Sequence, residues 1–204
     1  MNNRVEFFYD LSSPWTFMAF HSIGPVLEEA ATGMTLRPLL VGGVFNAVNE
    51  GVYANRANTK SPKSRALAKW TGEWAAFAGV PMNFPSPHHP LRSVHAMRMC
   101  CALEQDQTTL LRFSRAAFEA YFRDQRNLDD PAELVAVADV CGLDGKALAE
   151  ATQTQEIKDR LRANTDEAIA RGAFGSPTIF VDKEHMYFGN DQLPLVRARL
   201  LAGT

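Results

Sequence analysis

The chain has 204 residues, of which 46% are hydrophobic and 22% charged, and its formal net charge is −2 at pH 7. That length can bury a substantial apolar interior, in one large domain or in a core with an insertion. The charge leaves no basic excess to attract nucleic acid or anionic lipid, and no apolar run approaches the ~20 residues that span a bilayer. Because the first residues also lack the pattern of a signal sequence, we expect a cytoplasmic protein with neither nucleic acid nor membrane as partner.

The first predicted elements are a strand, a helix and a second strand. Residues 5–10 form a hydrophobic strand, after which Ser13 is a good helix N-cap and Pro14 takes the first helical position. Gly24-Pro25 predicts that the helix is kinked or divided, and residues 35–41 predict the second strand. Strand, helix and strand in this order are typical of a βαβ unit with a right-handed crossover.

The middle of the chain predicts helices and no strand. Apolar residues recur at helical spacing around Trp70 and again around Phe118. Asp130-Pro131 is a strong helix start and Gly142 a natural helix end. Polar loops rich in asparagine and proline are expected over residues 53–63 and 81–90.

The end of the chain returns to β-structure. A helix over residues 155–171 precedes strands over 178–182 and 185–188, and a last helix covers 192–202. Neither end has enough strands for a sheet of its own. We therefore predict an α/β fold in which residues 1–43 and 155–204 form one sheet domain and residues 44–154 form an inserted all-helical domain.

The cysteines and histidines predict no metal site. Cys100, Cys101 and Cys141 are odd in number and form no Cys-x-x-Cys pair, and adjacent residues of a helix face different directions. We expect three reduced structural thiols. His88 and His89 lie in a loop without ligand spacing, so no metal is expected there either.

Ser13 is the first candidate functional residue. A helix N-terminus carries roughly half a positive charge and free amide donors, and it therefore favours an anion. The hydroxyl of Ser13 could act only as the helix cap, or it could donate a hydrogen bond to a thiolate that another molecule supplies. Catalysis of the serine-hydrolase kind would need a base, and the sequence places no histidine beside Ser13.

The motifs together resemble the glutathione-using branch of the DsbA-like thioredoxin superfamily, which contains 2-hydroxychromene-2-carboxylate isomerases and kappa-class glutathione transferases. The resemblance covers essentially the whole chain. It rests on Phe8–Pro14, Gly42–Phe45, the segment from Lys63 through Trp70 and Trp74 to Pro81, Phe84-Pro85, Gly172–Thr178 and Phe188–Asp191. It implies a thioredoxin-like fold of the DsbA type, in which Ser13 and Thr16 stand where redox members have two cysteines. Such a protein exchanges no disulfide itself and borrows the sulfur of glutathione.

The resemblance also implies the roles of single residues. Ser13, rather than Ser12, would be the catalytic serine. Pro177 would be cis and would lie opposite the Ser13 turn, so that the backbone of Ser176 pairs with the cysteinyl part of glutathione, a small case of strand addition. Taken alone, Ser176-Pro177 could equally be a plain turn.

Charged and amide side chains would hold the ends of glutathione. The resemblance places Asn190 and Asp191 at its γ-glutamyl end and adds Lys63 as a further contact, although Asp191 could merely cap the last helix and Lys63 could be a solvated lysine. The contacting asparagine could be Asn49, Asn55 or Asn58: counting from Phe45 slightly favours Asn49, and counting from Lys63 favours Asn55.

The expected function follows from the same resemblance. We expect a homodimeric, glutathione-dependent isomerase of 2-hydroxychromene-2-carboxylate type, with Trp15 and Arg92 contacting a small aromatic substrate. Arg92 could also be an ordinary surface arginine. Two other functions remain open, namely a kappa-like transferase or peroxidase and a redox-inactive thioredoxin-like module that binds peptides at the Ser176-Pro177 edge.

Overall fold

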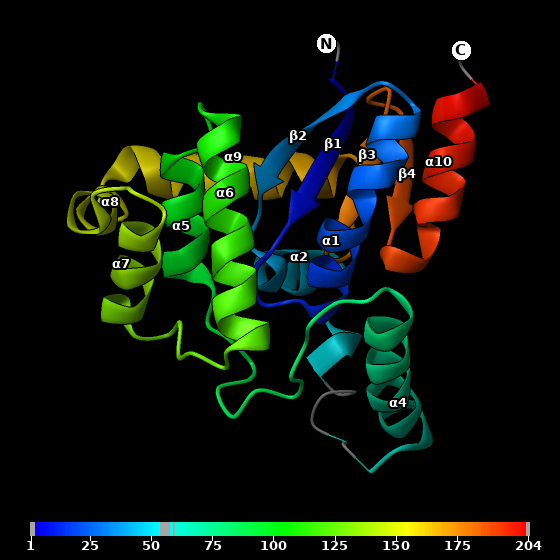
Figure 1. Cartoon of the computed structure of the whole chain (residues 1–204), viewed down its shortest axis with the longest axis horizontal. Coiled ribbons are helices and arrows are strands. Elements are labelled where there is room, and N and C mark those ends of the chain that lie inside the picture. Colours follow the sequence, from blue (N-terminus) through cyan, green and yellow to red (C-terminus); the bar gives the residue numbers. More distant parts are fainter. Residues whose placement is uncertain (1–2, 54–57, 59, 203–204) are drawn as a thin grey trace.

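The computed structural model describes residues 3–53, 58 and 60–202, and its centre is a four-stranded mixed sheet (Figure 1). The strand order is β2-β1-β3-β4; β1 is parallel to β2 and antiparallel to β3, and β3 is antiparallel to β4. The strands are β1 (Asn3–Tyr9), β2 (Gly33–Pro38), β3 (Thr178–Val181) and β4 (His185–Phe188). The two ends of the chain therefore build one sheet, which confirms the predicted α/β fold.

Helices cover the sheet and fill the long segment between β2 and β3. They are α1 (Pro14–Glu29), α2 (Val41–Val48), α4 (Pro62–Phe77), α5 (Val94–Ala102), α6 (Gln107–Phe118), α7 (Pro131–Val140), α8 (Gly145–Ala151), α9 (Gln155–Ala170) and α10 (Leu193–Ala202), with a π-helical turn η1 (Glu119–Arg123) and a 3-10 turn η2 (Asn190–Gln192). None of the described residues between β2 and β3 is in a strand, so the inserted helical region is also confirmed. Within the described chain, no helix is both long and apolar enough to cross a membrane.

Alternate residues of β1 face the two sides of the sheet, as the period of a strand requires. Phe7 belongs to the larger apolar cluster, which contains α1, α10 and the inserted helices, whereas Phe8 belongs to a smaller cluster with α2 and α9. On the larger side, the ring of Phe17 in α1 stacks on the rings of Phe118 and Phe122, each 5.4 Å away between centroids. Helix α1 thus joins the sheet to the inserted helices.

Two local predictions about the first half of the chain are wrong. The strand predicted over residues 35–41 ends at Pro38, and helix α2 begins at Val41. The main-chain N–H of Val41 donates to the carboxylate of Asp10 (2.8 Å), which starts a helix at a residue whose side chain favours a strand. Helix α1 runs through Pro25, so the predicted division there is wrong, and a kink at Pro25 stays a prediction.

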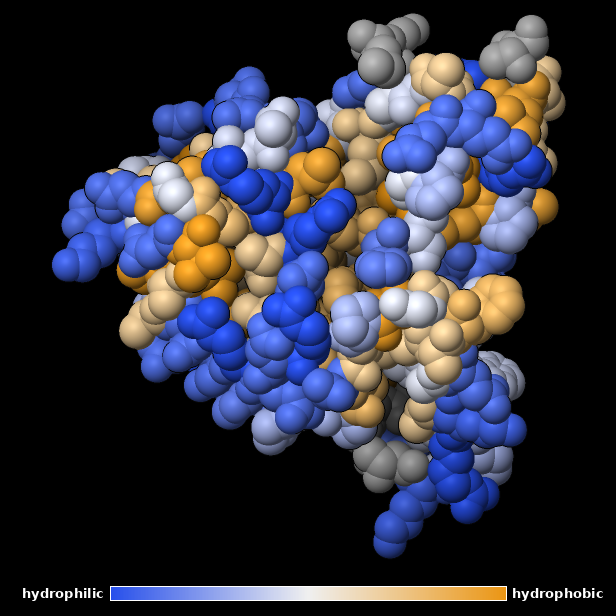
Figure 2. All heavy atoms as spheres, viewed as in Figure 1, coloured by the Kyte–Doolittle hydropathy of each residue, from blue (hydrophilic) through white to orange (hydrophobic). Residues whose placement is uncertain are grey.

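Helix α4 stands out from the body of the molecule, at the lower edge of Figure 1. Its buried face consists of Thr71 and Ala75, and it contacts α1. Three of its large apolar residues are exposed instead, namely Leu67 at 36%, Trp70 at 50% and Phe77 at 84% of their surface, whereas Trp74 is partly buried against the core. Hydrophilic residues cover much of the lower part of this helix on the face shown in Figure 2.

Candidate functional site

The turn between β1 and α1 presents the hydroxyl of Ser13. Ser13 is the N-cap of α1, as predicted, and its Oγ accepts a hydrogen bond from the N–H of Thr16 (3.2 Å). The same hydroxyl donates its proton to the main-chain carbonyl of Ser176 (3.0 Å), although 163 residues separate the two serines. The structure therefore brings together the two motifs that the sequence singled out.

Ser176 is held against this turn by its own side chain. Its Oγ accepts a hydrogen bond from the N–H of Asp10 (2.9 Å) and shares another with the hydroxyl of Thr16 (2.8 Å). Ser176 is only 5% exposed, and its peptide bond to Pro177 is cis, as expected. The backbone of Ser176 is thus fixed opposite the start of α1.

Two backbone donors at this place have no acceptor among the residues that the structure describes. They are the N–H of Trp15, in the first turn of α1, and the N–H of Ser176. Pro14, between Ser13 and Trp15, carries no N–H. A free amide at a helix start suits an anion, and a fixed N–H and C=O pair on one residue suits an extended peptide.

Asp10 fastens three segments around the turn. Its carboxylate is fully buried and accepts hydrogen bonds from the N–H of Ser12 (2.8 Å), the N–H of Val41 (2.8 Å) and the hydroxyl of Ser93 (2.9 Å). Burial raises the pKa of Asp10, and the donated hydrogen bonds oppose that rise. One side chain therefore fixes the Ser13 turn to the starts of α2 and α5.

Lys63 and Asp191 are the two charged residues that the sequence predicts for the ends of glutathione. Both are exposed, and neither has an ion pair with another described residue. Lys63 lies in the first turn of α4 and Asp191 in η2, and both of these elements contact α1. Gly189 lets the Asp191 side chain fold back, because a Cβ there would lie 2.5 Å from its Oδ1. Neighbouring Asn190 is only 6% exposed, and its side chain has no hydrogen-bond partner in the described structure.

The remaining predicted residues have structural contacts of their own. Asn49 donates from Nδ2 to the carbonyl of Phe174 (3.0 Å), which ties the end of α2 to the segment before Ser176. Asn55 lies outside the described residues. Trp15 is half-buried against the core. Arg92 is 84% exposed at its side chain and pairs with Asp129 (2.9 Å), so its guanidinium already has a carboxylate partner.

Sequence reasoning missed what Asp10 and Thr16 do here. Thr16 is the fourth residue of the turn, and the residues around Thr16 or Ser176 in the sequence do not predict the hydrogen bond between the two side chains. Asp10 offered a usable signal: an acidic residue at the end of a strongly apolar strand is buried only where several donors meet it.

None of the protein's own thiols lies in the Ser13 turn. Cys100, Cys101 and Cys141 are buried and unpaired. Burial raises the pKa of Cys100 to about 12 and raises the pKa of the other two thiols as well. All three are thus protonated at neutral pH.

We expect none of these thiols to react rapidly in the folded protein. A thiol reagent such as dithionitrobenzoate needs an accessible thiolate, so native protein at pH 8 should show no fast phase, and denatured protein should show all three groups. A stoichiometric fast phase in the native protein would contradict the buried placement.

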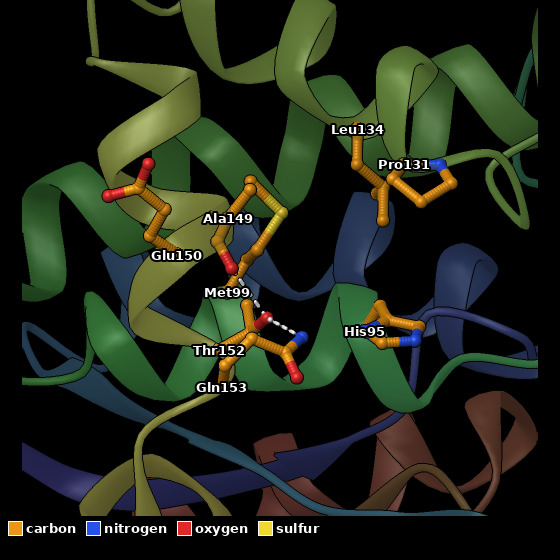
Figure 3. A pocket seen from close by; sticks show the side chains of 8 residues that line it. All are labelled: His95, Met99, Pro131, Leu134, Ala149, Glu150, Thr152 and Gln153. Atoms are coloured by element: carbon orange, nitrogen blue, oxygen red, sulfur yellow. Dashed lines mark hydrogen bonds between the residues drawn. The ribbon is translucent and has the colours of Figure 1, made fainter.

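A cavity of about 290 Å³ lies elsewhere, among the inserted helices (Figure 3). Met99 of α5, Leu134 of α7 and Ala149 of α8 line it, and the hydroxyl of Thr152 at its edge is already bonded to Ala149 and Gln153. It includes no residue of the Ser13 turn. The described residues also contain no group of three or more histidine, cysteine or acidic side chains arranged for a metal ion.

Comparison with known proteins gives consistent matches along the whole chain. The profile of the family described as "DSBA-like thioredoxin domain" matches residues 4–201. The chain is 27% identical to 2-hydroxychromene-2-carboxylate isomerase of Sphingobium xenophagum, over 98% of this chain and 100% of that protein. It is 26% identical to glutathione S-transferase kappa 1 of Rattus norvegicus, over 94% of this chain and 88% of that protein. A solved structure of a 2-hydroxychromene-2-carboxylate isomerase superposes with a TM-score of 0.80 at 20% identity, covering 97% of this chain and 94% of that chain.

Proposed function

Because the chain belongs to the family of DSBA-like thioredoxin domains, we propose that it binds glutathione at the Ser13 turn and isomerises a small aromatic substrate of 2-hydroxychromene-2-carboxylate type. One observation carries this proposal. The Ser13 hydroxyl at the start of α1 faces the fixed backbone of Ser176, in a turn with no cysteine of its own. Such a turn can stabilise a thiolate that it does not itself possess. Homologues named as isomerases and as kappa-class glutathione transferases are enzymes of this family.

The residues present fit the functional groups of glutathione. Glutathione has one ammonium group, two carboxylates, a thiol and a cysteinyl backbone. Asp191 would face the ammonium group, with Asn190 beside it, and Lys63 would face a carboxylate; neither charge is neutralised by a described partner. The free N–H and the carbonyl of Ser176 would pair with the cysteinyl backbone. Which asparagine helps, Asn49 or Asn55, stays open.

Bound glutathione would supply reversible addition of its thiolate to a conjugated carbon, which turns a double bond of the substrate into a single bond that can rotate, and elimination of the thiolate would restore the double bond. The chain's own residues prepare for this. Ser13 would donate a hydrogen bond to the sulfur, and the N–H of Trp15 would add a second donor at the positive end of α1. The Trp15 ring would contact the aromatic substrate. Arg92 could receive the substrate's carboxylate only by leaving Asp129.

A kappa-like transferase is the second candidate, since the similarity to the rat kappa enzyme is nearly as high and covers nearly as much of the chain. The two candidates share the thiolate site and differ in whether the sulfur leaves the product. A redox-inactive module that binds peptides at Ser176 is the third, and it needs no thiolate.

A direct assay separates these candidates. Protein is mixed with 2-hydroxychromene-2-carboxylate, with and without glutathione, and the approach to equilibrium is followed by absorbance. We expect isomerisation that requires glutathione in catalytic amounts and leaves it unconsumed. A glutathione conjugate as product would favour the transferase. Absence of glutathione binding by calorimetry would overturn both enzymatic functions.

Lys63→Ala and Asp191→Ala should each raise the KM for glutathione more than they lower kcat. Their proposed contacts are with parts of glutathione that do not change during the reaction, so their loss weakens ground state and transition state equally. Lys69→Ala, which breaks an exposed ion pair with Glu73 in the same helix, is the matched control. If the KM for glutathione were unchanged in both variants, glutathione would have to bind elsewhere.

The exposed row on α4 supports the further proposal of a cytoplasmic homodimer. Leu67, Trp70 and Phe77 leave a large apolar face uncovered, which a second copy would bury. The three unpaired thiols fit a reducing compartment, where glutathione is also kept reduced. Light scattering of the wild-type protein should give twice the chain mass of 22.6 kDa. The Phe77→Lys variant should give the mass of a single chain. A monomeric wild-type protein would exclude the homodimer.

A further inference from the structure

The Ser13 hydroxyl has one proton, and in this structure that proton is engaged. It is donated to the carbonyl of Ser176 at 3.0 Å, while the oxygen of the same hydroxyl accepts the N–H of Thr16. A hydroxyl has a single donor, so Ser13 cannot give a full hydrogen bond to Ser176 and to a sulfur at the same time. Ser13 must change partner before it can stabilise a thiolate.

The carbonyl that Ser13 would leave has no other donor. Among the described residues, only Ser13 donates to the oxygen of Ser176, and Ser176 is 5% exposed. The carbonyl is also unable to turn toward another donor, because the Ser176 side chain is fixed by Asp10 and Thr16. A buried carbonyl left without a donor is costly, so the change of partner is unfavourable unless a new donor arrives.

A cysteinyl peptide brings that donor together with the sulfur. In cysteine, the sulfur and the amide nitrogen are joined through two carbons, so both can reach atoms that lie one hydrogen-bond length apart, as Ser13 Oγ and the Ser176 carbonyl do. The amide N–H would take the place of Ser13 on the carbonyl, and the released hydroxyl would turn to the sulfur. A simple alkyl thiol offers no such N–H.

Resting on the proposed function, we infer that the paired contact of Ser13 with Ser176 makes the site selective for cysteinyl peptides, because only thiols with an amide N–H beside the sulfur can release Ser13 for thiolate stabilisation. Ser13 and the Ser176 carbonyl then act as a specificity determinant. Docking of the backbone and ionisation of the thiol are coupled through one proton donor.

The first test uses a ligand that cannot ionise, the glutathione analogue with a methyl group in place of the thiol. In the wild-type protein, its amide N–H must compete with Ser13 for the Ser176 carbonyl. In Ser13→Ala, the carbonyl is already without a donor. Calorimetry should therefore show about 2- to 10-fold tighter binding to Ser13→Ala than to wild type. Ser22→Ala, in the same helix at a half-buried serine without a described hydrogen-bond partner, is the control and should bind as wild type does.

The second test compares glutathione with its analogue methylated at the cysteinyl amide nitrogen, each at saturation. The ultraviolet absorbance of the thiolate, followed against pH, gives the pKa of the bound thiol, and the protein's buried thiols contribute nothing near neutrality. Bound glutathione should be at least about 10-fold more ionised than free glutathione, and the methylated analogue should gain much less.

The outcomes distinguish the selectivity for cysteinyl peptides from the binding of glutathione itself. Equal or weaker binding of the thiol-free analogue to Ser13→Ala, or equal ionisation of the two thiols, would overturn the selectivity while leaving glutathione binding intact. Failure of glutathione itself to bind wild-type protein would remove the proposed function and this inference with it.

Discussion

Replacing Ser13 by alanine is expected to raise the pKa of a glutathione thiol bound at α1 by about 1–2 units. A hydrogen bond to a charged group contributes about 1.5–3 kcal/mol, and each pKa unit corresponds to about 1.36 kcal/mol. The lost bond favours the protonated thiol, so the pH at which activity reaches half its maximum should rise. At neutral pH, kcat should fall by about 10- to 100-fold. Thiolate absorbance and the pH profile of kcat measure these effects separately.

The matched control for this variant is Ser61→Ala. Ser61-Pro62 starts α4 as Ser13-Pro14 starts α1, and the Ser61 hydroxyl accepts the N–H of Ser64 (3.1 Å). Either substitution removes an N-cap and should lower the free energy of unfolding by about 0.5–2 kcal/mol. Only Ser13→Ala should change the pKa of the bound thiol. If Ser12→Ala raised the pKa of the bound thiol and Ser13→Ala did not, the neighbouring serine would be the catalytic one.

Asp10→Ala should be the most destabilising single substitution around the site. It leaves the N–H groups of Ser12 and Val41 and the hydroxyl of Ser93 without an acceptor, and all three residues are buried. Each unsatisfied buried donor costs about 1–3 kcal/mol, against a total stability of about 5–15 kcal/mol for a typical domain. The denaturant midpoint should fall sharply, or the protein should fail to fold.

Asp144→Ala tests whether this loss is specific to burial. Asp144 is exposed and caps α8 by accepting only the N–H of Ala147 (2.9 Å), so its loss should cost about 0.5–2 kcal/mol. Asp10→Asn keeps the shape of the side chain but turns one acceptor into a donor that faces other donors, and its stability should lie between those of wild type and Asp10→Ala. Similar midpoints for Asp10→Ala and Asp144→Ala would show that the three donors find other acceptors.

The sequence predicted those features that depend on neighbouring residues. Ser13-Pro14 and Asp130-Pro131 start helices where local capping chemistry requires it, and residues 185–188 form a strand as predicted. The partition into a sheet built by both ends and a helical middle also followed from local periodicity.

The features that the sequence did not predict depend on partners far along the chain. Asp10 meets Val41 after 31 residues and Ser93 after 83, and the start of α2 depends on that first contact. The bond between Thr16 and Ser176 crosses 160 residues. The row on α4 shows the opposite failure: the periodicity of Leu67, Trp70 and Phe77 correctly predicted a helix, but periodicity does not say which face the fold covers.

The turn at the start of α1 contains Ser13 and Thr16 and no cysteine, and this has a consequence for the durability of the proposed catalyst. Neither hydroxyl is modified by the oxidants that attack an exposed thiolate, and the three cysteine thiols of the chain are buried and protonated. In the proposed reaction, the sulfur that oxidants can attack therefore belongs to glutathione, which diffuses in and out of the site. When that atom is oxidised, the spent molecule can leave and a fresh one can replace it, so damage consumes a small metabolite and spares the protein.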